Sequence, residues 1–196
     1  MESYTSNRMK IPPGFWAGLH QLGIAPRDIA RKARLPLTII TEPDVVTTEQ
    51  YFAIWQAYSD LIGDTAVGIV KLAAVFETAK YPPTVLATYH ARDYRDALRR
   101  MARYKQLCPP ESLRITEEGE RCTIELEWLD AERPGPPVLV GITLALLLEL
   151  GRRGTGQPLN ALSVEFSQSM GDVSSLEAYF GCRIRIGAEG NRLTLH

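Results

Sequence analysis

The chain has 196 residues, of which 45% are apolar and 23% are charged, and its formal net charge is −1. A chain of this length and composition is typical of a globular protein that buries a core without disulfides or metal ions. The near-zero charge leaves no overall basic field that would draw the chain onto nucleic acid, which argues against a DNA-binding domain.

The first half of the chain has the apolar spacing of helices. Apolar residues three and four positions apart predict a helix over 14–22, ended by Gly23. Pro26 suits the first turn of a second helix, which has an apolar face of its own. Residues 36–46 are expected to form a connector with an extended bias.

A third helix is expected over 48–62. Thr47 and Gln50 form a capping-box pattern at its start, and Gly63 occupies the terminating position. One face of this helix is apolar and partly aromatic: Tyr51, Ile54, Trp55, Tyr58, Leu61 and Ile62. An aromatic stripe at helical spacing usually belongs to the core, and lining of a pocket by Tyr51, Trp55 and Tyr58 is the alternative.

Further helical segments follow. Asp64 is placed to cap a helix that runs to about residue 74, the prolines at 82–83 suit the start of another, and 93–107 is strongly amphipathic. The polar face of this last helix is basic, with Arg92, Arg95, Arg99, Arg100 and Arg103. Binding of a phosphate, a carboxylate or DNA is one interpretation, and a solvated face paired with acidic neighbours is the favoured one.

The period then changes to that of strands. Apolar and polar residues alternate over 113–128 around a glutamate-rich turn at 117–120, which predicts a β-hairpin. After a proline-rich break at 134–137, an apolar helix runs to about residue 153. Its segment 138–150 is apolar nearly all round, so it lies either in the core, which we favour, or against another subunit.

The last part of the chain predicts a strand over 162–166, a helix over 174–180 ended by Gly181, and short strands over 183–186 and 192–195. The hairpin and the strand over 162–166 are expected to share one antiparallel sheet. Helices followed by antiparallel strands with helices between them indicate an α+β fold, without the βαβ repeats of a parallel sheet.

The cysteines and the apolar runs indicate a cytoplasmic protein. Cys108, Cys122 and Cys182 form no C-x-x-C pair, and an odd number argues against a secreted disulfide framework. The N-terminal residues lack the apolar core of a signal peptide, and the longest apolar run is shorter than the roughly 20 residues that span a bilayer. No linker composition stands out, so residues 1–196 are expected to form one compact domain with no membrane contact.

Nothing in the chain resembles a catalytic constellation. The three histidines, His20, His90 and His196, are scattered, and no pair has the i, i+4 spacing of a helical metal site. The glycines within 151–156 follow a helix, whereas phosphate-binding loops follow a strand and begin a helix. We therefore expect neither an enzyme nor a cofactor or metal site.

Three stretches together resemble the long N-terminal domain of AraC-type bacterial transcription regulators. The first is GLHQLGIAPRDIARKARLP at 18–36, and the second is ALRRMARYKQLCP at 97–109. The third runs from RRGTGQPL at 152–159 through VEF at 164–166 to YFGCRIRIGAEGNRL at 179–193, and it is the most specific. The stretches span most of the chain in the order of the family.

The sequence also departs from this family in two places. Arg183 stands where a proline is usual, and Tyr81-Pro82-Pro83 stands where a glycine-rich segment is common. The second departure concerns a segment that is expected to form part of the pocket wall.

The resemblance implies a domain that binds an unknown small-molecule effector and controls an attached helix-turn-helix domain. That domain would follow residue 196 in the full-length protein, would alone contact DNA, and would function in a homodimer. A dimerisation module without a ligand, built on 138–150, is the alternative. Candidate pocket residues are polar-tipped aromatic and ionisable groups near the ends of predicted elements: Tyr81, Tyr89, His90, Tyr104, Trp128 and Glu165.

Overall fold

The computed structural model describes residues 9–41, 45–75, 87–107, 110–129 and 131–196. Its N-terminal part is helical, as predicted, and the helices are α1 (Pro13–Gln21), α2 (Pro26–Ala33), α3 (Thr38–Thr41), α4 (Thr48–Ile62) and α5 (Thr65–Val75). Two short strands, β1 (Met9–Lys10) and β2 (Val45–Val46), pair antiparallel beside them.

The connector predicted over 36–46 is partly helical and partly extended where the structure describes it. A turn of helix, α3, occupies its middle, and β2 follows. The α4 helix has the predicted bounds because its capping box forms: Gln50 N donates to Thr47 Oγ1 at 3.2 Å, and Thr47 N donates to Gln50 Oε1 at 2.9 Å. Asp64 likewise accepts from the backbone of Val67 and caps α5.

The second half of the chain forms a five-stranded sheet with helices between the strands. The strands are β3 (Glu111–Glu118), β4 (Arg121–Trp128), β5 (Ser163–Phe166), β6 (Ile184–Ile186) and β7 (Asn191–Leu195), in the spatial order β3-β4-β7-β5-β6. The β3–β4 hairpin and β5 share this sheet, which confirms that prediction. The expected antiparallel pairing was wrong for one pair of strands, because β6 pairs parallel to β5 after the crossover through α9.

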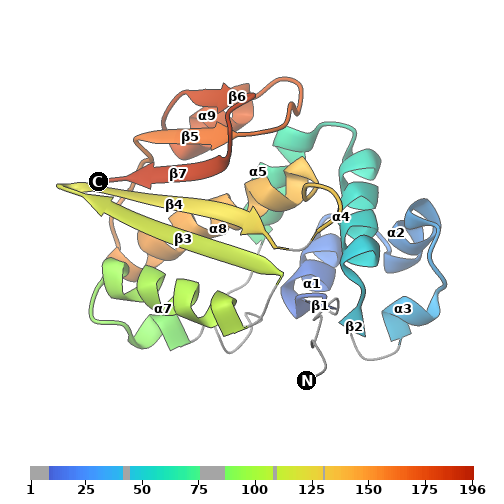
Figure 1. The fold of residues 1–196 in the computed structure, drawn as a ribbon. Coiled ribbons are helices and arrows are strands. Elements are labelled where there is room, and N and C mark those ends of the chain that lie inside the picture. Colours follow the sequence, from blue (N-terminus) through green and yellow to red (C-terminus); the bar gives the residue numbers. More distant parts are fainter. Residues whose placement is uncertain (1–8, 42–44, 76–86, 108–109, 130) are drawn as a thin grey trace.

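The remaining helices cover one face of the sheet and one of its edges (Figure 1). They are η2 (Ala87–His90), α7 (Tyr94–Leu107), α8 (Pro137–Thr155) and α9 (Ser174–Phe180). α8 crosses behind the sheet and packs against α5, while α7 lies along β3 (Figure 1). The arrangement is an α+β fold, as predicted. The helix expected to begin at residues 82–83 has its start outside the described residues, and η2 occupies its last positions.

α8 is a core helix. Leu144, Leu147 and Leu148 are at most 2% exposed in the single chain, because α5, α4, α7 and the sheet surround the helix. A twofold interface formed by these leucines is therefore excluded, and the favoured prediction for segment 138–150 is confirmed. Within the described ranges, every helix falls short of the length and apolar character needed to span a bilayer.

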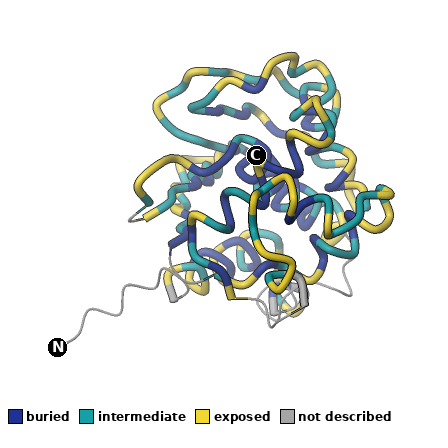
Figure 2. Tube along the Cα trace, turned by 90° about the vertical axis from the view of Figure 1, so that its right-hand side faces the viewer, coloured by how far each residue is buried: buried dark blue, intermediate teal, exposed yellow. Residues whose placement is uncertain are grey.

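The N-terminal helices and the sheet share one hydrophobic core, which appears as the dark blue trace through the middle of Figure 2. Phe15 of α1 packs on Trp55 of α4 with ring centroids 4.5 Å apart. Phe52 of α4 packs on Trp128 of β4 at 4.9 Å. The second contact joins the helical half to the hairpin.

The two described cysteines, Cys122 and Cys182, are half-buried free thiols. Burial, more than any nearby charge, raises the pKa of both thiols. At neutral pH both are therefore protonated and poor nucleophiles.

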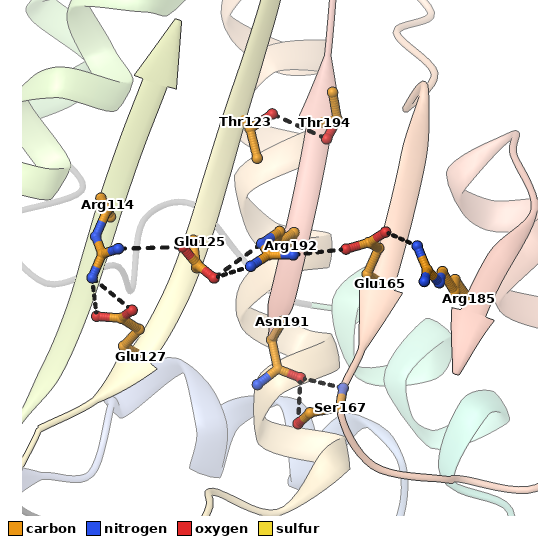
Figure 3. A network of polar contacts seen from close by, with 10 residues as sticks. All are labelled: Arg114, Thr123, Glu125, Glu127, Glu165, Ser167, Arg185, Asn191, Arg192 and Thr194. Carbon is orange, nitrogen blue, oxygen red and sulfur yellow. Dashed lines mark hydrogen bonds and ion pairs between the residues drawn. The ribbon is translucent and has the colours of Figure 1, made fainter. Parts of the chain in front are cut away.

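The outer face of the sheet carries a ladder of alternating charges, one from each strand (Figure 3). Arg192 of β7 contacts Glu125 of β4 at 2.8 Å and Glu165 of β5 at 3.3 Å. Arg114 of β3 lies 3.7 Å from Glu125, and Arg185 of β6 lies 3.2 Å from Glu165. Period-2 alternation places these charges outward and the apolar residues of the same strands toward α8.

Candidate ligand-binding site

A cavity of about 120 Å³ lies between α4, α7, α8 and β3. The lining residues of each helix lie three or four positions apart, and those of β3 lie two positions apart, so one face of each element borders the cavity. The residues around it are Pro12, Tyr51, Trp55, Met101, Lys105, Glu111, Leu113, Leu139, Ile142, Thr143, Leu146, Leu147 and Leu150.

α8 supplies the largest wall. Its lining residues fall at successive spacings of three and one from Leu139 to Leu150, which is a single stripe along a helix. The neighbouring faces of α8 pack against α5 and the sheet, so one helix contributes both to the core and to the cavity wall. The wall is aliphatic except at Thr143.

The polar part of the cavity is a charged pair. Glu111, the first residue of β3, shares the inward face of its strand with Leu113, and its side chain is 7% exposed. Lys105, one turn from Met101 on α7, forms an ion pair with the Glu111 carboxylate and is 29% exposed. Thr143 Oγ1 donates to Glu111 Oε1 at 3.4 Å. A buried carboxylate requires such partners, since burial without them costs several kcal/mol.

Two aromatic residues of α4 complete the wall. Burial, and then the nearby charge of Glu111, raises the pKa of the Tyr51 hydroxyl, so Tyr51 remains a neutral donor. The indole of Trp55 lies toward that hydroxyl and counteracts the shift slightly. The buried Trp55 Nε1 nevertheless meets no acceptor at hydrogen-bonding geometry among the described residues.

The residues predicted for the pocket from the sequence lie elsewhere where the structure describes them. His90 is exposed at the end of η2, and Tyr104 is 42% exposed on α7. Trp128 packs on Tyr51 and Phe52 beside the cavity and borders a surface hollow instead. None of these three lines the cavity.

Glu165 belongs to the outer charge ladder, on the far face of the sheet from the cavity (Figure 3). Tyr81 lies outside the described residues, and only the backbone of Tyr89 is described. Ligand contacts by the six residues predicted from the sequence stay a prediction.

The cavity residues were partly visible in the sequence. The aromatic spacing of Tyr51 and Trp55 allowed a pocket wall as the alternative to a core, and the structure shows that both residues are buried and also line the cavity. Glu111, Lys105 and Thr143 were missed. The available signals were a glutamate in phase with the apolar side of a strand and a threonine within an apolar helix.

The arginine-rich face of α7 borders a second hollow against β3, and four of its arginines contact two carboxylates, Asp96 and Glu117. Arg99 lies 2.9 Å from Glu117 and Arg100 lies 2.9 Å from Asp96, and Arg95 and Arg92 lie 3.6 Å from the same two carboxylates. The favoured prediction, a solvated face paired with acidic neighbours, is confirmed at these arginines. Among the described residues, no group of three potential ligands is placed to hold a metal ion.

The chain is similar to known transcription regulators. A family model described as the N-terminal arabinose-binding domain of AraC transcription regulators matches residues 23–196. Among solved structures, transcriptional regulator CdpR from Pseudomonas aeruginosa is similar, with a TM-score of 0.56 and 17% sequence identity. The match covers 93% of this chain and 53% of that one, so the chain spans about half the length of that regulator. No curated protein matches.

Proposed function

The chain belongs to the family of N-terminal arabinose-binding domains of AraC transcription regulators, and from this we propose that it senses a small-molecule effector in the cavity between α4, α7, α8 and β3. Effector binding would bias the equilibrium of an attached DNA-binding domain. The matching family model describes transcription regulators and the similar solved structure is a transcriptional regulator, which supports a regulatory rather than an enzymatic role.

One observation carries the proposal: the buried Glu111 carboxylate stands at the wall of an otherwise mainly aliphatic cavity. Ligand sites in proteins combine apolar walls with a few placed polar groups that fix orientation. The ion pair with Lys105 and the hydroxyls of Thr143 and Tyr51 provide such groups on one side of this cavity.

The position of the cavity suits a sensor. A ligand there would touch α4 from the helical half together with α7, α8 and β3 from the half that contains the sheet. It would thereby add contacts between two parts of the fold that are otherwise joined through the core. A ligand stabilises only the conformation that it binds better, so these contacts would favour one arrangement of the elements over others.

We further propose that the regulator acts in the cytoplasm as a homodimer and contacts DNA only through a separate domain. Linking two DNA-binding domains makes the second contact intramolecular and raises affinity for paired half-sites. Because Leu144, Leu147 and Leu148 are buried within one chain, the dimer would use a surface other than α8.

A cavity-filling variant tests the site. Leu146 lies on the cavity wall of α8 and is half-buried, so Leu146→Trp would occupy the space with little cost to the core. Leu61→Trp places the same side chain on an exposed helical position away from the cavity and is the matched control. Metabolites would be screened by thermal shift against the original chain and both variants.

A metabolite that raises the melting temperature of the original chain and of Leu61→Trp, but not of Leu146→Trp, supports the proposal. A metabolite that protects all three chains equally would show that the effector binds outside this cavity.

A further inference from the structure

We propose that the effector is an uncharged molecule with a compact apolar body and one hydrogen-bond donor, such as a phenol or a small aromatic alcohol. The inference rests on the proposed function, since it concerns the same cavity. It follows from the size of the cavity, its walls, the free acceptor capacity of Glu111 and the neutrality of the Glu111–Lys105 pair.

Size limits the ligand first. The cavity measures about 120 Å³, and an apolar protein cavity of about 150 Å³ binds benzene. A ligand body of roughly six non-hydrogen atoms, the size of one benzene ring, therefore fits without large rearrangement, with a short substituent at the cavity wall. Larger metabolites would have to extend out of the cavity.

The walls select an apolar body. Leu139, Ile142, Leu146 and Leu150 form one side, and Met101 closes another. A sugar such as arabinose carries hydroxyls around its ring, and most of them would face these aliphatic side chains without a hydrogen-bond partner. Each such loss costs about 1–3 kcal/mol of desolvation, so sugars are disfavoured.

The acceptor for the donor group is Glu111 Oε1. The other oxygen of this carboxylate, Oε2, binds Lys105, whereas Oε1 receives, among the described residues, only the long 3.4 Å contact from Thr143. A carboxylate has about four acceptor positions. With the side chain 7% exposed, water fills few of them, and a donor from the ligand would complete the set.

Charge balance argues that this donor is neutral. Glu111 and Lys105 already compensate each other beside the cavity. A ligand carboxylate would have to separate Lys105 from Glu111 and leave a buried anion unpaired. A ligand ammonium would add a positive charge, or displace Lys105, in a largely aliphatic space. Both changes carry a large desolvation penalty, which a hydroxyl avoids.

Four probes with a common benzene ring test this inference on the unmodified chain: toluene, benzyl alcohol, benzylamine and benzoate. At one shared concentration, benzyl alcohol should raise the melting temperature most, by on the order of 3 °C at ten times its Kd. Its affinity, measured by titration, should exceed that of toluene about tenfold, as expected for one hydrogen bond to a charged acceptor. Stronger binding by benzylamine or benzoate would overturn the inference.

The variant Glu111→Gln separates the role of the carboxylate from that of the walls. It replaces the charged acceptor with a neutral amide oxygen, so it should reduce the preference for benzyl alcohol over toluene below tenfold while leaving toluene binding unchanged. A retained tenfold preference in the variant would overturn the inference. If the variant does not fold, the ranking of the probes on the unmodified chain still decides.

The same probes distinguish the two proposals when they are repeated on Leu146→Trp and Leu61→Trp. If a charged probe binds best and only Leu146→Trp blocks it, the cavity is the site and the ligand class is wrong. If the filled cavity leaves all probe binding unchanged, the proposed site itself fails.

Discussion

The hydroxyl of Tyr94 donates a 2.6 Å hydrogen bond to the backbone carbonyl of Leu147, 53 positions later in the chain. This bond joins the first residue of α7 to the middle of α8, and the two helices form neighbouring walls of the cavity. Burial raises the pKa of Tyr94, so the hydroxyl stays protonated and remains a donor across the physiological range.

The Tyr94 ring requires a glycine beneath it. A Cβ at Gly151 would lie 2.5 Å from the Tyr94 ring and 2.9 Å from Leu159, whereas a Cβ at Gly154 meets nothing within 4 Å. Gly151→Ala should therefore destabilise by about 1–3 kcal/mol through overpacking, although alanine favours a helix. Gly154→Ala, the control on the same helix, should stabilise by about 0.5–1 kcal/mol. Urea unfolding measures both values, and equal effects at the two glycines would contradict this account.

The stability of the fold should fall at alkaline pH because Tyr179 is half-buried in its neutral form. Burial first, and then the charge of Glu149, raises the pKa of Tyr179 to about 12, above its usual value of about 10. The unfolded chain therefore loses this proton first, and stability falls as the pH rises from about 10 to 12. Tyr179→Phe keeps the ring over which Arg152 lies at 5.0 Å, yet removes the titrating group.

The variant should accordingly lose less stability over this range than the original chain, as measured by urea midpoints at pH 9, 10, 11 and 12. Parallel pH curves for the two proteins would show that Tyr179 does not contribute.

A charge at the centre of α8 should unfold the chain. Leu147 is 2% exposed, and Lys105, the cation of the adjoining cavity, is already paired with Glu111, so Leu147→Glu would bury an uncompensated carboxylate and cost more than about 3 kcal/mol. Leu61→Glu, at an exposed position of α4, should leave the fold intact. Circular dichroism and light scattering would follow both. A folded but monomeric Leu147→Glu, obtained from a dimeric parent, would place this leucine at an interface instead.

The chain by itself should not bind duplex DNA in a sequence-dependent way. Its net charge is −1, and Arg99 and Arg100 of α7 are paired with carboxylates. A gel-shift assay at physiological salt checks this. Retardation at low salt alone agrees with the expectation, since nonspecific phosphate contacts are salt-sensitive. Sequence-dependent retardation at physiological salt would refute it.

Local signals in the sequence predicted most of the helices because their ends are decided by neighbouring residues. α4 begins and ends where its capping box and Gly63 indicate, and α9 ends before Gly181, whose φ of 71° is costly for other residues. Pairing between distant segments was not predictable in this way. β1 and β2 are two residues each, and nothing local marks β6 as a parallel partner of β5.

The cavity was less predictable than the fold because four elements that are distant in sequence enclose it. Trp128, a polar-tipped aromatic residue near the end of a strand, is predicted from the sequence to line the pocket, yet its ring packs against Phe52 and Tyr51. Lys105 and Glu111 are six positions apart, but their pairing depends on how α7 folds back along β3. No periodicity and no motif in the sequence marks such a pair of residues.

The order of the strands also determines when the sheet is completed during synthesis. β7, the last strand to leave the ribosome, is the middle strand and pairs with β4 on one side and β5 on the other. Ile124 must therefore wait for Leu193, its partner across the ladder, until synthesis has passed residue 193. Until then β4 and β5 each expose an edge able to pair with another chain. A ribosome that stalls or terminates before residue 191 would release a protein with two open strand edges, which is a substrate for chaperones and a seed for aggregation.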